Sequence, residues 1–404
     1  MTEPAIPAGP STPDGQIPLG LWPDQDPNLH RVGIYKFEID ATELNQVLRA
    51  AVVPRRGTPF LTIEVSTSAL KCIAQTKDAS FVISKSTPLL PRAEIGSAPI
   101  AFEVDRNVIM NTIRHFTGQL ALTFDRDLSS LAWTEKGENE GERSFRIGAR
   151  RVPPAAPETG LRQLAVITRD VGGGIRYAAT LIGRKEPPNF PYDGVIIEGG
   201  SILGGYYCGA SRCRSSVLPE SLVLSVPKEH VANAVALCSR LAGKVEVLES
   251  DSRIYLRTPN IEGSWNRIDQ RSSGLLNEPF EVPPLQTVLV DTRRLQNMTY
   301  GMAALFEENL QVTVENRDAS ARLVLSGSSK IGRAMMSLEG RIVGDGAGIQ
   351  RPWDLTFIAK DLRDAVLATS TTYTLLGVLE RGLFVQSEGS EAEFKTVLLG
   401  RERQ

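Results

Sequence analysis

A short strand that leads directly into a helix recurs along this sequence, and it constrains the fold more than any other feature. In the first copy, residues 35–39 alternate apolar and polar side chains as a strand does, and Asp40 is a favourable helix N-cap. Leu44, Val47 and Leu48 then recur at helical spacing. Further copies of the strand begin at Phe102, Leu224, Val288 and Leu355, the last with its helix one residue out of step. An internal repeat of this kind predicts a chain built from copies of one supersecondary unit.

The repeating unit continues beyond its helix into three further strands. In the first unit, alternating runs at 59–65, 70–75 and 80–83 are separated by turn-forming residues. The second unit has the same order, with a helix at 105–117 followed by three short runs that end at Ile147. We therefore expect a β-α-β-β-β unit, with two units in each domain.

The third unit fits this pattern poorly. We expect its helix at 160–169 without a clear strand before it, and a strand pair that starts at 172–177 and runs through 178–182 and 194–198. The later units are regular again. Six half-units in three domains give an α+β fold. We expect a flexible Pro-rich tail at 1–33 and domains at 34–152, 158–270 and 282–404.

Composition limits what the chain can bind. Lys and Arg total 45 against 47 Asp and Glu, a formal charge of -2, so a nucleic-acid surface would have to be a segregated basic face. Four Cys in 404 residues argue against a disulfide scaffold and indicate a reducing cytoplasm. No apolar run reaches the roughly 18 residues of a membrane helix, so we expect a cytoplasmic protein with no membrane partner. The tail is read as having no role, with a partner-binding segment at 19–22 as the alternative.

Repeated units of this kind would expose sheet edges unless the array closed on itself. Closure into a ring with every helix on one side places the helices inside, where duplex DNA would require cations. The helices and their flanks carry such cations: Arg49, Arg55, Arg56, Arg106, Arg114, Lys228, Arg240, Arg293 and Arg294. Any one of them is most simply a solvated charge, but the whole set in a chain of charge -2 favours a DNA-facing lining.

Three segments resemble the bacterial-type sliding clamp, the β subunit of DNA polymerase III, as a divergent member. Residues 44–65, with the basic turn at 55–59, are similar to the opening segment of that family, where a basic loop touches DNA. Residues 146–157 resemble its first interdomain connector, and 174–177 are similar to the Arg-Tyr strand that opens its middle domain. The resemblance runs from about Ile34 to the C-terminus.

The resemblance implies a closed ring with helices inside and sheets outside, formed by a head-to-tail homodimer without chemistry of its own. Such a ring encircles double-stranded DNA without sequence preference, and it tethers DNA polymerase and the clamp loader, which bind through a short peptide motif. The motif enters a pocket between the middle and last domains, and matching positions would place these residues there: Ile197, Gly199, Ser201, Ile202, Trp265, Leu398, Leu399 and Arg401. Residues 199–202 read Gly-Gly-Ser-Ile where the family commonly has Gly-His-Arg-Leu, and the loop from Lys185 to Asp193 is additional. These departures indicate either that the pocket prefers a different peptide, or that it belongs to a divergent clamp such as one from a phage or plasmid.

Other functional classes find less support in the sequence. No P-loop, nucleophile elbow or zinc-protease motif is present, so we expect no catalytic residue, metal or cofactor. Cys208 and Cys213 lack a second ligand pair nearby, and Gly344 to Gly348 is read as a linker rather than a phosphate loop. The main alternative is a non-catalytic β-rich repeat scaffold or phage structural protein that does not encircle DNA. An enzyme of unrecognised type ranks third.

Overall fold

The computed structural model describes twelve stretches of the chain. They are 34–90, 99–135, 143–156, 158–168, 171–182, 194–241, 243–268, 274–330, 332–343, 349, 352–388 and 392–401. The Pro-rich tail, the loop from Lys185 to Asp193 and the segment from Gly344 to Gly348 lie outside these residues.

The first pair of units, called domain 1, repeats the expected order twice. Its first unit has β1 (Ile34–Asp40), α1 (Ala41–Ala50), β2 (Phe60–Val65), β3 (Ala69–Gln75) and β4 (Phe81–Pro88). Its second unit has β5 (Ile100–Asp105), α2 (Arg106–Ile113), β6 (Gln119–Asp125), β7 (Ser130–Glu135) and β8 (Arg143–Val152). The first strand of each unit pairs with the first of the three later strands of the other, β1 with β6 and β5 with β2, so the two units interlock.

Domain 2 shows that the sequence reading of the third unit was wrong. Residues 162–168 form a strand, β9 (Arg162–Thr168), where a helix was expected, and the helix α3 (Val171–Ala178) occupies the segment read as a strand. The Arg-Tyr pair at 176 and 177 therefore lies in a helix. The unit ends with the 3-10 turn η1 (Ala179–Leu181), β10 (Gly194–Glu198), β11 (Ser201–Tyr206) and β12 (Gly209–Ser215), so it is a regular β-α-β-β-β unit.

The remaining units follow the expected order. The second half of domain 2 has β13 (Leu224–Pro227), η2 (Lys228–His230), α4 (Val231–Cys238), β14 (Lys244–Glu249), β15 (Arg253–Arg257) and β16 (Ile261–Asn266). Domain 3 has β17 (Gln286–Asp291), α6 (Thr292–Leu305), β18 (Asn309–Arg317), β19 (Ser320–Ser329) and β20 (Gly332–Val343). Its second half has β21 (Trp353–Ile358), α7 (Ala359–Leu367), β22 (Tyr373–Leu379), β23 (Gly382–Glu388) and β24 (Ala392–Leu399).

Aspartate side chains start three of these helices, as the sequence predicts. Asp40 accepts hydrogen bonds from the backbone of Thr42 and Glu43, and Asp105 does the same for α2. Asp291 accepts from the backbone N–H of Arg294 at 2.8 Å. These bonds satisfy amide donors that have no partner within the helix.

Strand pairing between domains joins the units into two twelve-stranded sheets. The first runs β1-β6-β7-β8-β5-β2-β3-β4-β16-β15-β14-β9, and the second runs β13-β10-β11-β12-β24-β23-β22-β17-β20-β19-β18-β21. The β4 and β16 pair connects domain 1 to domain 2, and the β12 and β24 pair connects domain 2 to domain 3. Domain junctions are therefore hydrogen-bonded sheet rather than loose linkers.

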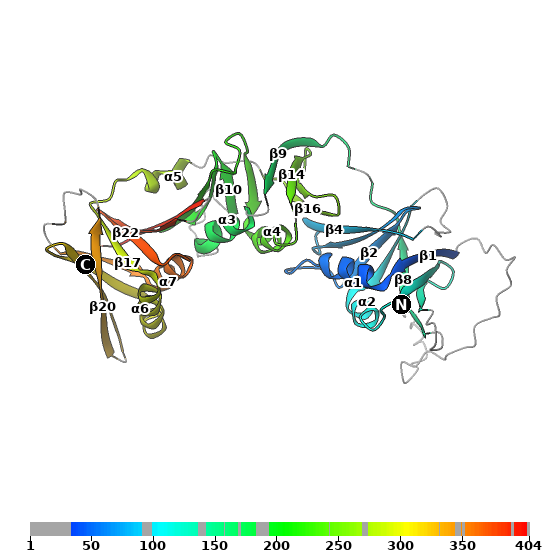
Figure 1. Ribbon diagram of the computed structural model, residues 1–404, viewed down its shortest axis with the longest axis horizontal. Helices are drawn as coiled ribbons and strands as arrows, with labels where there is room; N and C mark the ends of the chain where they lie inside the picture. Colours follow the sequence, from blue (N-terminus) through cyan, green and yellow to red (C-terminus); the bar gives the residue numbers. More distant parts are fainter. Residues whose placement is uncertain are drawn as a thin grey trace, which may run out of the picture.

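The three domains form an arc, with the helices α1, α2, α3, α4, α6 and α7 on its concave side and the sheets on its convex side (Figure 1). Apolar side chains from these helices and from the inner face of each sheet fill the cores, among them Leu44, Ile109, Leu237, Leu295 and Val366. The polar faces of the helices are left to line the inside of the arc.

One helix lies outside this plan. α5 (Gly274–Glu281) lies between the second and third expected domains, at 158–270 and 282–404, where no helix was predicted. Its Leu276 and Phe280 pack on the outer sheet surface with Leu203 and Val397, where domains 2 and 3 meet. In Figure 1 it lies on the convex side, away from the other helices.

Candidate nucleic-acid interface

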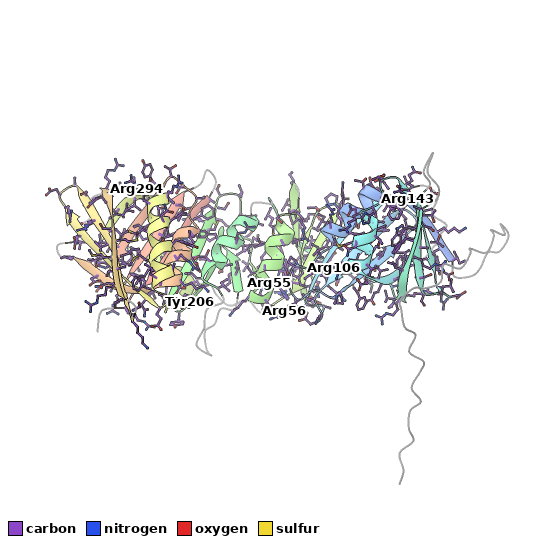
Figure 2. All side chains as sticks on the ribbon, turned by 90° about the horizontal axis from the view of Figure 1, so that it is seen from below. Arg55, Arg56, Arg106, Arg143, Tyr206 and Arg294 are labelled. Atoms are coloured by element: carbon purple, nitrogen blue, oxygen red, sulfur yellow. The ribbon has the colours of Figure 1, made fainter. Side chains whose placement is uncertain are left out.

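The cations expected to line a DNA channel come from the concave side of the arc. Figure 2 views this side and places Arg55 and Arg56 near the middle of the arc, with Arg106 farther toward domain 1 and Arg294 toward the opposite end. Seven of the nine predicted cations belong to α1, α2, α6 and the segments that directly follow them, and six of those seven have exposed side chains.

Several cations lie where the helix dipole opposes them. Arg106 is the first residue of α2, and Arg293 and Arg294 are in the first turn of α6. The N-terminus of a helix carries a partial positive charge, so a cation there costs about 0.3 to 1 kcal/mol instead of stabilising the helix. Helix stability therefore does not explain these arginines, whereas an external anion at these positions would.

Arg49 and Arg114 lie at the opposite ends of their helices. Arg49 is in the last turn of α1, Arg114 is the C-cap of α2, and both are exposed. The dipole favours cations at these positions, so the two residues give weaker evidence for an anionic partner. Arg114 also donates through Nε to Nε2 of His115 at 3.2 Å.

Arg55 and Arg56 project from a turn between α1 and β2. Arg56 has a left-handed backbone with φ of 58°, which is uncommon for a residue other than glycine. Both side chains are exposed. The turn is the part of domain 1 that reaches α4 of domain 2, because the backbone N–H of Arg55 donates to Oδ1 of Asn233.

Arg240 has a different role from the one expected. Its guanidinium donates to the carbonyl oxygens of Ala50 and Val52, both at 2.8 Å, and burial lowers its pKa from the usual value. It therefore connects domain 2 to the end of α1 instead of extending into the channel. Lys228, in η2, is also partly buried.

Arg176 is a channel candidate that the sequence reading missed. It is exposed in the last turn of α3, on the concave side of domain 2. Three consecutive glycines, Gly172 to Gly174, weaken the helical pattern and led to the strand assignment. The spacing of the apolar residues Val171, Ile175 and Ala178 fits one face of a helix, and this pattern predicts α3 correctly.

The eight residues expected in a partner-peptide pocket do not come together. Ser201 pairs with Arg214 and Leu398 pairs with Gly209, five steps along β12, or about 17 Å at the usual strand rise. Ile197 and Ile202 face each other in the core of domain 2, at the end of β11 next to the Gly199 turn. Trp265 is in the other sheet, where it stacks on Phe81.

Leu398, Leu399 and Arg401 instead meet the turn between β11 and β12. The backbone N–H of Leu399 donates to the carbonyl of Cys208 at 2.8 Å, and Tyr207 beside it is 45% exposed. Cys208 raises the pKa of the Tyr207 phenol, while the Arg401 guanidinium acts in the opposite direction. One turn joins β10 to β11 and contains Gly199, and a second turn joins β11 to β12. The predicted pocket lies at the first turn, whereas the C-terminal strand meets the second.

Buried polar contacts hold this junction between domains 2 and 3. Tyr206 on β11 donates to Asp361 on α7, and both side chains are at most 4% exposed. Thr396 on β24 donates to the hydroxyl of Tyr177 at 2.9 Å, and burial raises the pKa of that tyrosine well above its usual value. Breaking these hydrogen bonds costs free energy, because each buried polar group would then be without water and without a partner.

Metal-ligand clusters, membrane helices and cavities add little to the basic face in the described part of the chain. No group of three metal-ligating side chains gathers within these stretches, and none of their helices is long and apolar enough to cross a membrane. A cavity of about 710 Å³ on domain 3 is lined by Arg294, Arg317, Arg341 and Tyr373 among others, and it is open and mixed in charge.

Comparisons with known proteins identify the architecture. No family model matches the sequence, and no curated protein matches it. Solved structures do match: the DNA polymerase sliding clamp from Bacillus subtilis aligns with a TM-score of 0.72 and 13% identity, over 92% of this chain and 100% of that one. The β sliding clamp of C. crescentus gives 0.70 and 16%, over 92% and 100%, and the clamp of Pseudomonas aeruginosa gives 0.71 and 12%, over 91% and 100%. This chain has the fold of the bacterial DNA polymerase sliding clamps.

Proposed function

We propose that this protein is a DNA sliding clamp, a non-catalytic processivity factor that encircles duplex DNA in the cytoplasm. The observation that carries the proposal is the concave face, where helices from all three domains present arginines in a chain of net charge -2. Contacts to phosphate attract DNA without reading its sequence, and their weakness permits sliding. Domains at 34–152, 158–270 and 282–404 are part of this proposal.

Closure of the ring would use the two ends of the arc in a head-to-tail homodimer. The strand β8 pairs on one side only over 143–148, and β20 pairs on one side only over 332–340, so no described strand covers the other side of these segments. Exposed strand edges of this length invite pairing with another chain. Apolar side chains accompany both edges: Met335 (67% exposed), Tyr300 (60%) and Leu305 (53%) at one end, Val108 (44%) and Phe145 (39%) at the other. Antiparallel pairing of β8 with the β20 of a second copy would cover them.

Partner proteins would bind at the junction of domains 2 and 3. Leu398, Leu399 and Arg401 meet the exposed Tyr207 there, which provides apolar surface beside a cation. We propose that DNA polymerase and the clamp loader dock a short peptide motif at this place. The ring would then keep a bound polymerase at high effective concentration near the primer end, which is the physical basis of processivity.

The test is whether DNA retention depends on topology. Light scattering should give a particle of twice the 44.0 kDa chain. After loading on a nicked circle, the protein should stay bound at high salt and be released once the circle is cut to a linear form. A monomer with no retention at any salt, or retention that is unchanged by linearisation, would contradict the proposal.

A further inference from the structure

The turn that carries Arg55 and Arg56 is held on one side by its own domain. Beyond the turn, the backbone N–H of Lys77 donates to the carbonyl of Arg56 at 3.1 Å, and that of Thr58 donates to Gln75 at 2.9 Å. These bonds attach the end of the turn to β3 and to the hairpin that follows it.

The other side of the turn is held by domain 2. The side-chain amide of Asn233 in α4 accepts from the backbone N–H of Arg55 at 3.1 Å and donates to the Arg55 carbonyl at 3.4 Å. Asn233 is 1% exposed, so these bonds are shielded from water. One side chain therefore satisfies both backbone groups of a DNA-facing residue in another domain.

Arg240 extends the same attachment. It follows Asn233 by seven residues, or about two helical turns, so the two side chains leave the same face of α4 and its extension. Its bonds to Ala50 and Val52 mean that this face binds four backbone groups between residues 50 and 55. The segment between α1 and the basic turn thus takes its position from domain 2.

We propose that Asn233 is a positioning residue that sets the Arg55 and Arg56 turn for contact with the DNA backbone. The inference rests on the proposed clamp function. Two long arginine side chains reach phosphates effectively only when the backbone that carries them is fixed, because each loses conformational freedom on binding. DNA contact by domain 1 is therefore coupled to the junction where β4 pairs with β16, and bending that junction would release the turn.

The experiment is a double-mutant cycle on the full-length protein, read by fluorescence anisotropy with a short linear duplex at low salt. Asn233→Ala should weaken binding by about 2- to 10-fold, the usual worth of one or two hydrogen bonds. In an Arg55→Ala/Arg56→Ala background the same substitution should have no further effect, since the guanidiniums through which it acts are gone. Asn260→Ala, at an exposed position in the turn between β15 and β16, is the matched control and should leave affinity unchanged.

Hydrogen exchange on the unmodified protein gives a second measurement that needs no variant to fold. The Arg55 amide should be protected despite its exposed side chain, and Asn233→Ala should abolish that protection. An equal loss of affinity in both arginine backgrounds, or an unprotected Arg55 amide, would overturn the role of Asn233 while leaving the clamp proposal intact. If Arg55→Ala/Arg56→Ala leaves DNA affinity unchanged, the DNA contact itself is refuted, and this inference falls with it.

Discussion

At the scale of single residues, His230 gives the junction of domains 1 and 2 a pH dependence. It is 2% exposed, its ring centroid lies 5.6 Å from that of Phe81, and its Nδ1 has no hydrogen-bond partner among the described residues. Burial lowers its pKa from the usual 6.5, and it outweighs the opposite effects of Glu229 and Asp78. The folded protein thus favours the neutral imidazole.

The sign of the pH effect follows from this lowered pKa. Between the pKa of His230 in the folded protein and 6.5, the unfolded chain binds more protons than the folded chain. The contribution of neutral His230 to stability is therefore fully present above about pH 6.5 and is lost as the pH falls below that value. Denaturant midpoints from pH 5 to 7.5 should show this loss, and His230→Phe should reduce it. A loss of the same size in His230→Phe would contradict this assignment.

Arg293 should affect DNA binding and stability in opposite directions. Arg293→Ala removes one proposed phosphate contact, so the slope of log affinity against log salt should fall by about 0.9. It also removes a cation from the first turn of α6, so the free energy of unfolding should rise by about 0.3 to 1 kcal/mol. Lys330→Ala makes the same charge change at a hairpin and should alter neither quantity by as much. A lower stability for Arg293→Ala would refute the dipole argument.

At the scale of elements, the close packing of α3 on β11 depends on Gly204. A Cβ there would lie 2.4 Å from the carbonyl oxygen of Ala178 and 2.8 Å from a methyl of Ile182. Gly204→Ala should therefore destabilise the protein by about 1 to 3 kcal/mol, because backbone has to move. Gly173→Ala, in α3 with nothing near the added methyl, should stabilise by about 0.5 to 1 kcal/mol. Equilibrium unfolding in denaturant compares the two, and an equal effect of both substitutions would contradict this account of the packing.

The same elements show why sequence predicts some of this fold and not the rest. Asp40, Asp105 and Asp291 each mark a strand-to-helix transition by local chemistry, so these units could be placed from sequence. α3 was not predicted because two of its three glycines serve packing between elements: Gly172 lies against Cys238 and Gly174 against Ile202. Tertiary contacts of this kind override local propensity.

The candidate site divides in the same way. The basic residues of the proposed channel follow from their position on repeated helices, which the repeat makes predictable. Arg240 contacts domain 1 through a hydrogen bond to Ala50, and Leu398 meets Gly209 through strand pairing, in both cases between residues about 190 positions apart. Nothing local in the sequence specifies those pairings.

At the scale of the whole molecule, the ends of the arc should control ring closure, and the concave face should control DNA affinity. Leu305→Asp and Met335→Asp place charge on exposed apolar surface at the β20 end, so together they should convert a dimer to a monomer in sedimentation. The monomer should no longer be retained on a nicked circle, because a broken ring has no topological link to DNA. It should still bind a short duplex weakly and with strong salt dependence, since the arginines of the concave face are unchanged. Val217→Asp makes the same kind of change at an exposed position in domain 2 and should preserve both the dimer and its retention. If the double variant became monomeric yet stayed on the closed circle, direct contacts rather than encirclement would hold the protein on DNA.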